Sequence, residues 1–539
     1  MTSISDRVRG RQTPAPTSLP EPATDLRPGV HADRHPERLA AVMADGTAGL
    51  TYRELEYRSQ RLACAIADRG LGPGDRVAIL LGNHPSYFVA AWAAQRAGVA
   101  YTPVNWHLTA EETAYIVADS GARALISSHR LLSLAEPAAA SSSVTWRLLV
   151  DGRTDGWETL EDAVRHAPDS DAVDRVEGQW MFYSSGTTGR PKGIVRPAAT
   201  TPYGSGTPID SLLGGQYGFG PDTVYLCPAP LYHAAPLGWS MGTQRRGGTV
   251  VVLESFDPVR VLEAVERHRV THAQFVPTMF IRLLKQPAEV RSRYDLSSLE
   301  VVVHAAAPCP PEVKRQMLDW WGPIIHEYYA GSEGTGFVAI GPDEWLTHPG
   351  SVGRSKRGPV HILDESGAPL PAGSDGMVWF EGGGRFDYHR DPAKTRAAFN
   401  PEGWSTLGDI GHLDADGYLY LTDRANDLIL TGGVNVYPQE VERVLLLHPQ
   451  VLDAGVIGAP DPDLGERAVA FVELIDGVTG DEQLEQDLFA HLRAHLASVK
   501  RPRTVTFLDQ LPRLPTGKLL RRRLRDLLPV PPGTRDPVA

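Results

Sequence analysis

The sequence predicts an α/β protein of several packing units, and three observations carry this prediction. Short buried strands alternate with helices from about residue 76 to about residue 260, which is typical of layered folds with largely parallel strands. A β-rich section follows over about 350–422, and after Arg424 the composition becomes that of a compact α+β module. The chain has 539 residues, which exceeds one hydrophobic core, so we expect roughly three or four packing units.

Local signals place the individual elements. Thr51 and Glu54 fit a capping box that opens an amphipathic helix running to Ala67. A Gly/Pro turn at 71–75 then precedes a buried strand. The remaining expected elements are strands over 76–81, 99–104, 376–380 and 417–421, and helices over 86–97, 440–447 and about 481–497.

Composition and charge exclude several classes of function. Hydrophobic content of 42% and charged content of 22% are ordinary for a globular protein. The net charge of −12 argues against nucleic acid as the main partner. Three cysteines without metal-type spacing fit a reducing compartment. No apolar run reaches transmembrane length and no secretory signal is visible, so we expect a cytoplasmic protein without a membrane span.

The most informative stretch is 183–197, which reads YSSGTTGRPKGIVRP. Its glycines let backbone N–H groups approach an anion, its hydroxyls add donors, and its lysine adds a charge suited to phosphate. A flexible surface turn would explain a shorter match, but ten positions of this composition favour a phosphate-binding loop. It is not a GxxxxGK[ST] loop, because Pro191 stands five positions after Gly186. The predicted phosphate contacts are Ser184, Ser185, Gly186, Thr187, Thr188, Gly189 and Lys192.

This stretch closely resembles the signature phosphate loop of the adenylate-forming superfamily of acyl-CoA synthetases, luciferases and peptide-synthetase adenylation domains. Companion segments resemble the other motifs of that superfamily, in the same order. They are 230–233 (PLYH), 301–308 (VVVHAAAP), 327–334 (EYYAGSEG), 403–409 (GWSTLGD), 422–433 (TDRANDLILTGG) and 514–518 (LPTGK). The resemblance covers nearly the whole chain and is specific for the superfamily rather than for a substrate.

The resemblance implies roles for residues along the nucleotide and the acid. His233, which in isolation would be a packed or surface histidine, would lie beside the carboxylate that is activated. Ala305, Ala306 and Ala307 end a buried strand, where small side chains leave room for a flat ligand such as adenine. Ala305 stands where the family usually has Gly, on the wall shared by adenine and the acyl group. Its methyl group is therefore expected to narrow the acyl pocket.

Further ATP contacts follow from the later motifs. Tyr329 would stack on adenine, Ser332 would contact the α-phosphate, and Glu333 would hold Mg²⁺, which typically takes one carboxylate plus substrate phosphates. Asp409 would accept both ribose hydroxyls, and Arg424 would also contact the ribose. Alone, Glu333 would be read as a solvated turn residue, and Asp409 as part of a Gly-Asp turn.

The resemblance also assigns roles in the C-terminal module. Lys518 would be the catalytic lysine of adenylation, stabilising charge that grows in the transition state. Asn426 occupies the hinge position, where the family commonly has Asp or Lys. Gly432 and Gly433 would line the tunnel for the pantetheine arm of CoA.

The fold implied by the resemblance has a large N-terminal domain of two α/β sheets plus a small β-barrel, and a small mobile α+β C-terminal domain. The expected limits are a disordered leader at 1–30, an adenylation domain at 31–422 with its barrel-like part at about 350–422, a mobile lid at 423–526 and a tail at 527–539.

The implied function is that of an ATP-dependent acid–thiol ligase with Mg²⁺ and CoA as cofactors. A carboxylate would attack ATP to give acyl-AMP and pyrophosphate, and CoA would then take the acyl group. The favoured acid is fatty or small and hydrophobic. The alternatives are loading of a separate acyl carrier protein, activation of an aromatic acid or transfer to a non-thiol nucleophile, and a catalytically inactive adenylate-binding protein, against which Lys518 argues. The resemblance leaves the acid open and allows a homodimer.

Overall fold

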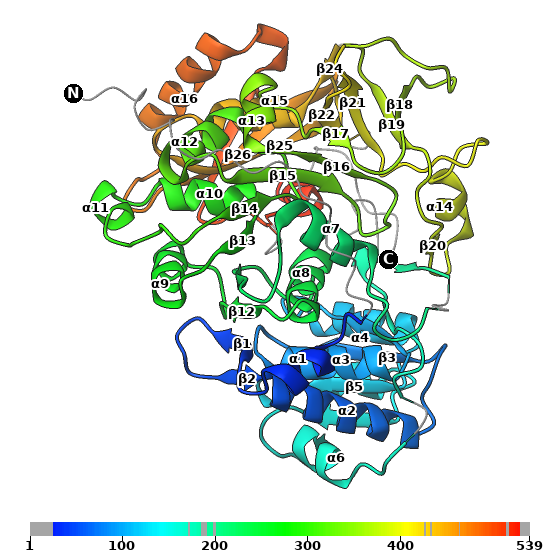
Figure 1. The fold of residues 1–539 in the computed structure, drawn as a ribbon. Coiled ribbons are helices and arrows are strands. Elements are labelled where there is room, and N and C mark those ends of the chain that lie inside the picture. Colours follow the sequence, from blue (N-terminus) through cyan, green and yellow to red (C-terminus); the bar gives the residue numbers. More distant parts are fainter. Residues whose placement is uncertain are drawn as a thin grey trace.

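The computed structural model describes residues 25–170, 173–184, 191–197, 201–424, 427–431, 434–462, 464–513 and 517–528 (Figure 1). These residues form a multi-sheet α/β fold with a large N-terminal domain and a small C-terminal domain, as the sequence predicted.

The first sheet is parallel throughout and has the strand order β7-β6-β5-β3-β4-β8. Its strands are β3 (Arg76–Leu80), β4 (Ala100–Pro103), β5 (Ala124–Ser127), β6 (Trp146–Leu149), β7 (Glu158–Thr159) and β8 (Gln179–Trp180). The helices of this region are α2 (Tyr52–Asp68), α3 (Ser86–Arg96), α4 (Ala110–Ser120), α5 (Leu132–Ala140) and α6 (Leu160–His166), with the short helix η2 (His129–Leu131). All eleven residues of α3 are buried, because this helix is apolar on most sides and has protein around it.

The second sheet has nine strands in the order β17-β16-β15-β14-β13-β11-β12-β1-β2, parallel in its centre and antiparallel at both edges. The strands are β1 (Leu39–Met43), β2 (Gly49–Thr51), β11 (Val224–Cys227), β12 (Thr249–Val252), β13 (His272–Phe275), β14 (Val301–His304), β15 (Ile325–Ala330), β16 (Phe337–Ile340) and β17 (Arg354–Ser355). The accompanying helices are α1 (Pro28–Arg34), α7 (Pro208–Tyr217), α8 (Ala234–Arg245), α9 (Pro258–His268), α10 (Pro277–Leu284), α11 (Ala288–Arg291), α12 (Pro311–Trp321) and α13 (Pro342–Thr347).

Two small sheets complete the N-terminal domain. One has the order β20-β10-β9, and the other is antiparallel with the order β18-β19-β21-β22. Their strands are β9 (Tyr183–Ser184), β10 (Lys192–Val195), β20 (Asp387–Tyr388), β18 (Val360–Leu363), β19 (Gly376–Phe380), β21 (Asp409–Leu413) and β22 (Leu419–Arg424), and α14 (Pro392–Ala397) follows β20. The second of these sheets occupies the section predicted to be β-rich.

The C-terminal domain has its own five-stranded sheet and its own hydrophobic core. The sheet has the order β24-β23-β26-β25, and β27 also pairs with β26. The elements are β23 (Ile429–Thr431), β24 (Val434–Val436), β25 (Val451–Asp461), β26 (Gly465–Leu474), β27 (Thr504–Leu508), α15 (Pro438–Leu446), α16 (Glu482–His495), η3 (Ser498–Lys500) and α17 (Arg521–Arg525).

The local sequence predictions for the first elements are confirmed. Thr51 accepts a hydrogen bond from the Glu54 N–H, and Glu54 accepts one from the Thr51 N–H at 2.8 Å, so the predicted capping box opens α2. The strands and helices expected over 76–104 appear as β3, α3 and β4. Residues 28–30, which the sequence placed in the leader, belong to α1; just before this helix, Leu26 pairs with Gly204 and Arg245.

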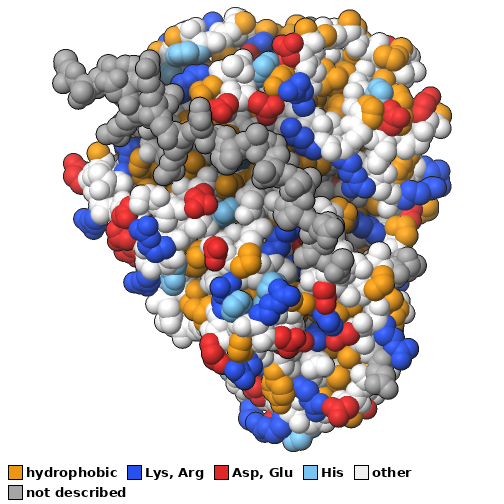
Figure 2. Space-filling model, viewed as in Figure 1, with side chains coloured by type: hydrophobic (Ala, Val, Ile, Leu, Met, Phe, Trp, Pro, Cys, Tyr) orange, Lys and Arg blue, Asp and Glu red, His pale blue; other side chains and the backbone are white. Residues whose placement is uncertain are grey.

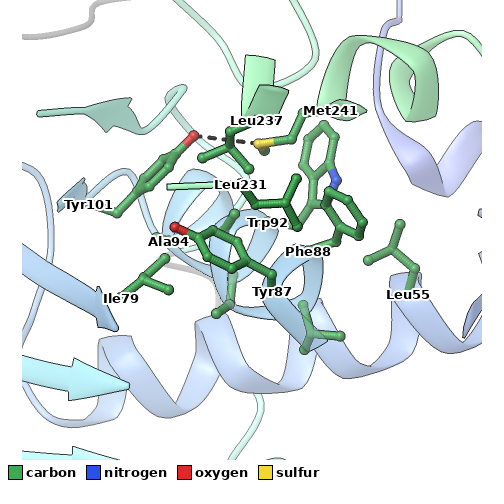
Figure 3. Close-up of a cluster of buried hydrophobic side chains, with 14 of the residues drawn as sticks. Leu55, Ile79, Tyr87, Phe88, Trp92, Ala94, Tyr101, Leu231, Leu237 and Met241 are labelled. Atoms are coloured by element: carbon green, nitrogen blue, oxygen red, sulfur yellow. Dashed lines mark hydrogen bonds between the residues drawn. The ribbon is translucent and has the colours of Figure 1, made fainter. Parts of the chain in front are cut away.

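One core cluster joins the two large sheets (Figure 3). Tyr87, Phe88 and Trp92 of α3 pack there against Leu231 and against residues of α8. Tyr101 of β4 donates a hydrogen bond to the sulfur of Met241 in α8 at 3.5 Å. Helix α8 is therefore held between the sheets, and this fixes the position of its N-terminus.

Acidic and basic side chains are interspersed on the face shown in Figure 2. Within the part of the chain that the structure describes, no helix has the length and apolarity needed to cross a bilayer.

Candidate active site

The predicted ribose residues lie on two neighbouring strands. Asp409 begins β21 and pairs with Arg424, at the end of β22, in the antiparallel register. The hydroxyl of Tyr329, at the end of β15, donates a hydrogen bond to Oδ2 of Asp409. Asp409 is only 7% exposed. The fold thus brings together three residues that are up to 95 positions apart in the sequence.

Glu333 has a partner that the sequence did not reveal. The hydroxyl of Tyr388 in β20 donates to Oε1 of Glu333 at 2.9 Å. The ammonium of Lys394 lies 4.1 Å from the centre of the Tyr388 ring, and burial lowers the pKa of Lys394 while Glu333 raises it. Lys192 of β10 forms an ion pair with Asp391 at 3.4 Å, and Asp391 caps α14 by accepting from the N–H of Lys394. Lys394 therefore lies near Glu333, and Lys192 lies close to Lys394 through their shared partner Asp391.

A half-buried arginine supports the turn that carries Ser332. Arg196 follows β10 and donates from Nη2 to the carbonyl oxygen of Ser332 at 3.0 Å. Gly334 has a φ of +73°, and a Cβ there would lie 2.8 Å from the same Nη2, so the turn needs glycine at this position. Burial lowers the pKa of Arg196, and the nearby charge of Glu333 partly offsets this effect. No sequence motif indicated the role of Arg196.

A buried cluster of titratable groups lies behind the predicted adenine wall. Ala305–Ala307 follow β14, and Ala306 has a φ of +74°, a strained conformation for a residue other than glycine. Below the wall, Oε2 of Glu327 lies 2.7 Å from Nζ of Lys314 and 3.3 Å from Nε2 of His304. Lys314 and His304 are 0% exposed, so this cluster ties α12, β14 and β15 together without solvent.

His233 is the residue that precedes α8. Its Nε2 is enclosed, with no hydrogen-bond partner among the described residues. Burial first, and then His107, lowers the pKa of His233 to about 3, so the ring is neutral near pH 7. A neutral imidazole can donate or accept one further hydrogen bond, depending on its tautomer.

Aromatic side chains pack in the buried cluster that also contains Ala305 and Ala330. The ring of Trp239 in α8 stacks on Tyr328 of β15 at 5.7 Å and 13°, and Tyr328 stacks on Phe337 at 5.2 Å and 21°. Gln274 donates to the hydroxyl of Tyr328 at 2.8 Å and so fixes that ring. Tyr328 alternates with Tyr329 along the strand, so the two rings point to opposite faces of the sheet.

The turn before Lys518 lies against the N-terminal domain. Gly517 has a φ of +78°, and a Cβ there would lie 2.7 Å from Oγ1 of Thr278 and 3.2 Å from the side chain of Val276. Lys518 itself is half-buried. The residue predicted to act on the carboxylate thus lies at the interface between the two domains.

The remaining predicted site residues fall in segments whose placement is not described. Ser185, Gly186, Thr187, Thr188, Gly189, Asn426, Gly432 and Gly433 lie outside the described residues. For Ser184 and Arg424 only the backbone is described: Ser184 pairs with Lys192 across β9 and β10.

Comparisons with known proteins identify the family of the chain. Residues 30–387 match the AMP-binding enzyme family, and residues 440–518 match the AMP-binding enzyme C-terminal domain. A feruloyl-CoA synthase from Amycolatopsis sp is 36% identical over 489 residues, which cover 90% of this chain and 95% of that protein. The fatty acid–[acyl-carrier-protein] ligase ScoC from Streptomyces coeruleorubidus is 32% identical over 92% of this chain and 94% of its own length.

A solved structure shows the same fold. The amide bond synthetase McbA from Marinactinospora thermotolerans is 30% identical and superposes with a TM-score of 0.76 over 93% of this chain and 100% of its own. The sequence matches extend along most of the chain, and the structural match covers both domains. The protein therefore belongs to the AMP-binding enzyme family, within the adenylate-forming superfamily, and is an acid-adenylating ligase.

Proposed function

We propose that the protein converts an aromatic carboxylic acid and ATP into an aryl-adenylate and pyrophosphate, and then transfers the acyl group to CoA. The observation that carries the choice of acid is the stack of Trp239 on Tyr328. Among the acids that the sequence left open, this aromatic wall favours a flat aryl acid over the fatty acid first preferred.

The shape of the wall supports a short, flat acid. The family resemblance places the acid between the segment around His233 and the wall at Ala305. The small residues after His233, Ala234 and Ala235, and Ala305 of the wall belong to the same buried cluster as Trp239 and Tyr328. Trp239 is 1% exposed and packs against Tyr217 at 5.3 Å, so a long alkyl chain would have to displace a fixed side chain.

An aryl ring of the acid would be stabilised by neighbouring aromatic side chains. Aromatic pairs in offset-stacked or edge-to-face geometry contribute about 0.5–1.5 kcal/mol beyond the burial of their area. The relative named feruloyl-CoA synthase, at 36% identity, supports both the aromatic acid and the choice of CoA as acceptor.

The site residues divide the work of adenylation. Asp409 and Tyr329 would hold the nucleoside, and Lys192 and Lys394 would face the phosphates. Glu333 would hold Mg²⁺ together with ATP oxygens; a single carboxylate suits this ion, and it would neutralise phosphate charge. Lys518 would stabilise the charge that develops between the carboxylate and the α-phosphate. Positioning and electrostatics therefore carry the reaction.

The test is ATP–pyrophosphate exchange with cinnamic, hydroxycinnamic, benzoic and straight-chain fatty acids, repeated with CoA while AMP is measured. We expect exchange with the aryl acids and faster AMP release when CoA is added. A preference for fatty acids would contradict the proposed acid. Exchange that CoA does not affect would contradict the proposed acceptor and point to a carrier protein or an amine.

A further inference from the structure

One arginine of the C-terminal domain is bonded both to a strand of that domain and to the turn before Lys518. The guanidinium of Arg513 contacts both carboxylate oxygens of Asp453 in β25, with Nη2 donating to Oδ1 at 2.8 Å. Nη2 also donates to the carbonyl oxygen of Ala454 at 3.0 Å. The remaining nitrogen, Nη1, donates to the carbonyl oxygen of Gly517 at 2.6 Å. Such bidentate arginine–carboxylate contacts fix the orientation of the guanidinium as well as its distance from the carboxylate.

The backbone closes the base of the same loop. Arg513 and Leu519 form an antiparallel bridge, and the N–H of Leu520 donates to the carbonyl oxygen of Pro512 at 2.8 Å. The side chain of Arg513 adds a hydrogen bond within the loop, to the carbonyl oxygen of Gly517. The side chains of Arg513 and Asp453 are 19% and 9% exposed, so water competes little for these bonds.

The strand that holds Arg513 is itself attached to the N-terminal domain. Lys285, which follows α10, donates from Nζ to the carbonyl oxygen of Val451 at the start of β25. Gly517 lies against Thr278, in the first turn of α10, and against Val276, the residue that precedes the helix. Helix α10 therefore meets both β25 and the Lys518 turn. Arg513 joins β25 to the turn at Gly517 by hydrogen bonds, and Leu519 adds apolar packing against β25.

We propose that Arg513, held by Asp453, is a positioning residue for Lys518: it places the turn at Gly517 against the start of α10 and so sets the lysine for adenylation. This rests on the proposed role of Lys518 in the first half-reaction. We expect Arg513 to have no role in the transfer to CoA. The family resemblance implies that the C-terminal domain rotates before this step and takes Lys518 away from the site.

The experiment compares two half-reactions in Arg513→Met, Arg513→Lys and Asp453→Asn. Adenylation is followed by pyrophosphate exchange, and transfer by thioester formation from supplied acyl-adenylate and CoA. We expect Arg513→Met to slow adenylation about 10- to 100-fold, since a misplacement of about 1 Å can cost that much. Transfer should stay within about 2-fold. Arg513→Lys keeps the charge without the bidentate contact and should fall between.

Two references separate the possible failures. Lys518→Ala tests the proposed function: if it leaves adenylation intact, the role of Lys518 fails and the inference fails with it. If Lys518→Ala slows adenylation but Arg513→Met and Asp453→Asn do not, only the inference is overturned. Lys500→Met is the matched control, because it removes a 2.7 Å ion pair with Glu440 in the same domain, away from the turn. It should leave both half-reactions unchanged.

A measurement without substrate completes the test. Hydrogen exchange of the amides at 517–520 should speed up in Arg513→Met, while exchange in α16 stays unchanged. Equal acceleration in both segments would mean general loss of stability and would overturn a specific positioning role. Unchanged exchange at 517–520 would overturn it as well.

Discussion

Two buried ion-pair clusters support the candidate active site from behind, and they differ in what they hold. Glu327 with Lys314 lies beneath the wall at Ala305–Ala307, between strands and a helix of the large sheet. Asp453 with Arg513 lies beneath the turn at Gly517, in the small domain. The first cluster joins α12 to β14 and β15, which are also held together by the strand pairing of the large sheet. The second governs one turn, through one side chain.

The difference has a physical consequence. Removing a charge from the first cluster leaves its partner inside the core, so the cost falls on folding. Removing Arg513 from the second also leaves a carboxylate with little exposure, although Asp453 still accepts a hydrogen bond from the N–H of Ala454. The same change loosens a turn at a domain interface, so a cost to catalysis is added. The predictions below test this contrast, from the largest expected effect to the smallest.

The largest effect is expected for Lys314→Met. It leaves the carboxylate of Glu327 buried without its cation and should lower the free energy of unfolding by about 3–5 kcal/mol. All eleven tryptophans precede residue 405, so tryptophan fluorescence in urea reports the N-terminal domain. The double variant Lys314→Met/Glu327→Leu should recover most of the loss. An equally large loss in the double variant would show that the charge of Glu327 is not the cause.

Lys518→Ala should act on catalysis alone. We expect adenylation to fall about 10²- to 10³-fold, the usual loss when one charge-stabilising group is removed. Thioester formation from supplied acyl-adenylate should be nearly unchanged, and so should the urea midpoint. Arg523→Ala, an exposed charge five residues further on, is the control. Equal losses in both half-reactions would refute the assignment of Lys518 to the first step.

Acidic pH should weaken the N-terminal domain. Burial is the main cause that lowers the pKa of His233 to about 3, that of His326 to about 4 and that of His304 well below its usual value. Unfolded histidines titrate near 6.5, so below that pH the unfolded state binds more protons and stability is lost as pH falls. We expect a loss on the order of 1–2 kcal/mol per histidine at pH 5, measured by tryptophan fluorescence in urea.

One substitution tests the contribution of a single histidine to the dependence of stability on pH. His326→Gln removes one of the three contributions and should flatten the decline between pH 7 and pH 5. An unchanged slope would mean that His326 is not buried in its neutral form.

The smallest effect is expected for Trp239→Ala. Opening the wall should raise the ratio of fatty-acid to aryl-acid exchange about 10-fold, within the range of about 1–3 kcal/mol by which hydrophobic pockets discriminate. Trp239→Phe keeps a ring and should keep the preference for aryl acids. If Trp239→Ala accepts the same acids as the unchanged protein, the wall does not set the choice of acid.

Prediction from the sequence worked where the signal is local. The capping box at Thr51 and Glu54 was visible because a helix start uses residues three positions apart. The residues of the adenylate motifs were visible because each motif is a short run in a fixed order. Their roles stay predictions, and the segments at 185–190, 425–426 and 432–433 lie outside the described residues.

The partners of those residues could not be predicted in the same way. Tyr388 reaches Glu333 because β20 pairs with β10, and Arg196 reaches Ser332 across 136 positions. Neither tyrosine nor arginine has a local pattern that distinguishes such a role from that of an ordinary surface residue.

By itself, the sequence determined the alternation of helices and strands, the phosphate loop and the order of the motifs, because hydrophobic period, capping and turn residues act over a few positions. Only the tertiary structure decided that Trp239 lies on Tyr328 and that Arg513 joins Asp453 to Gly517. These contacts depend on strand order and register, which bring together side chains that no local pattern connects.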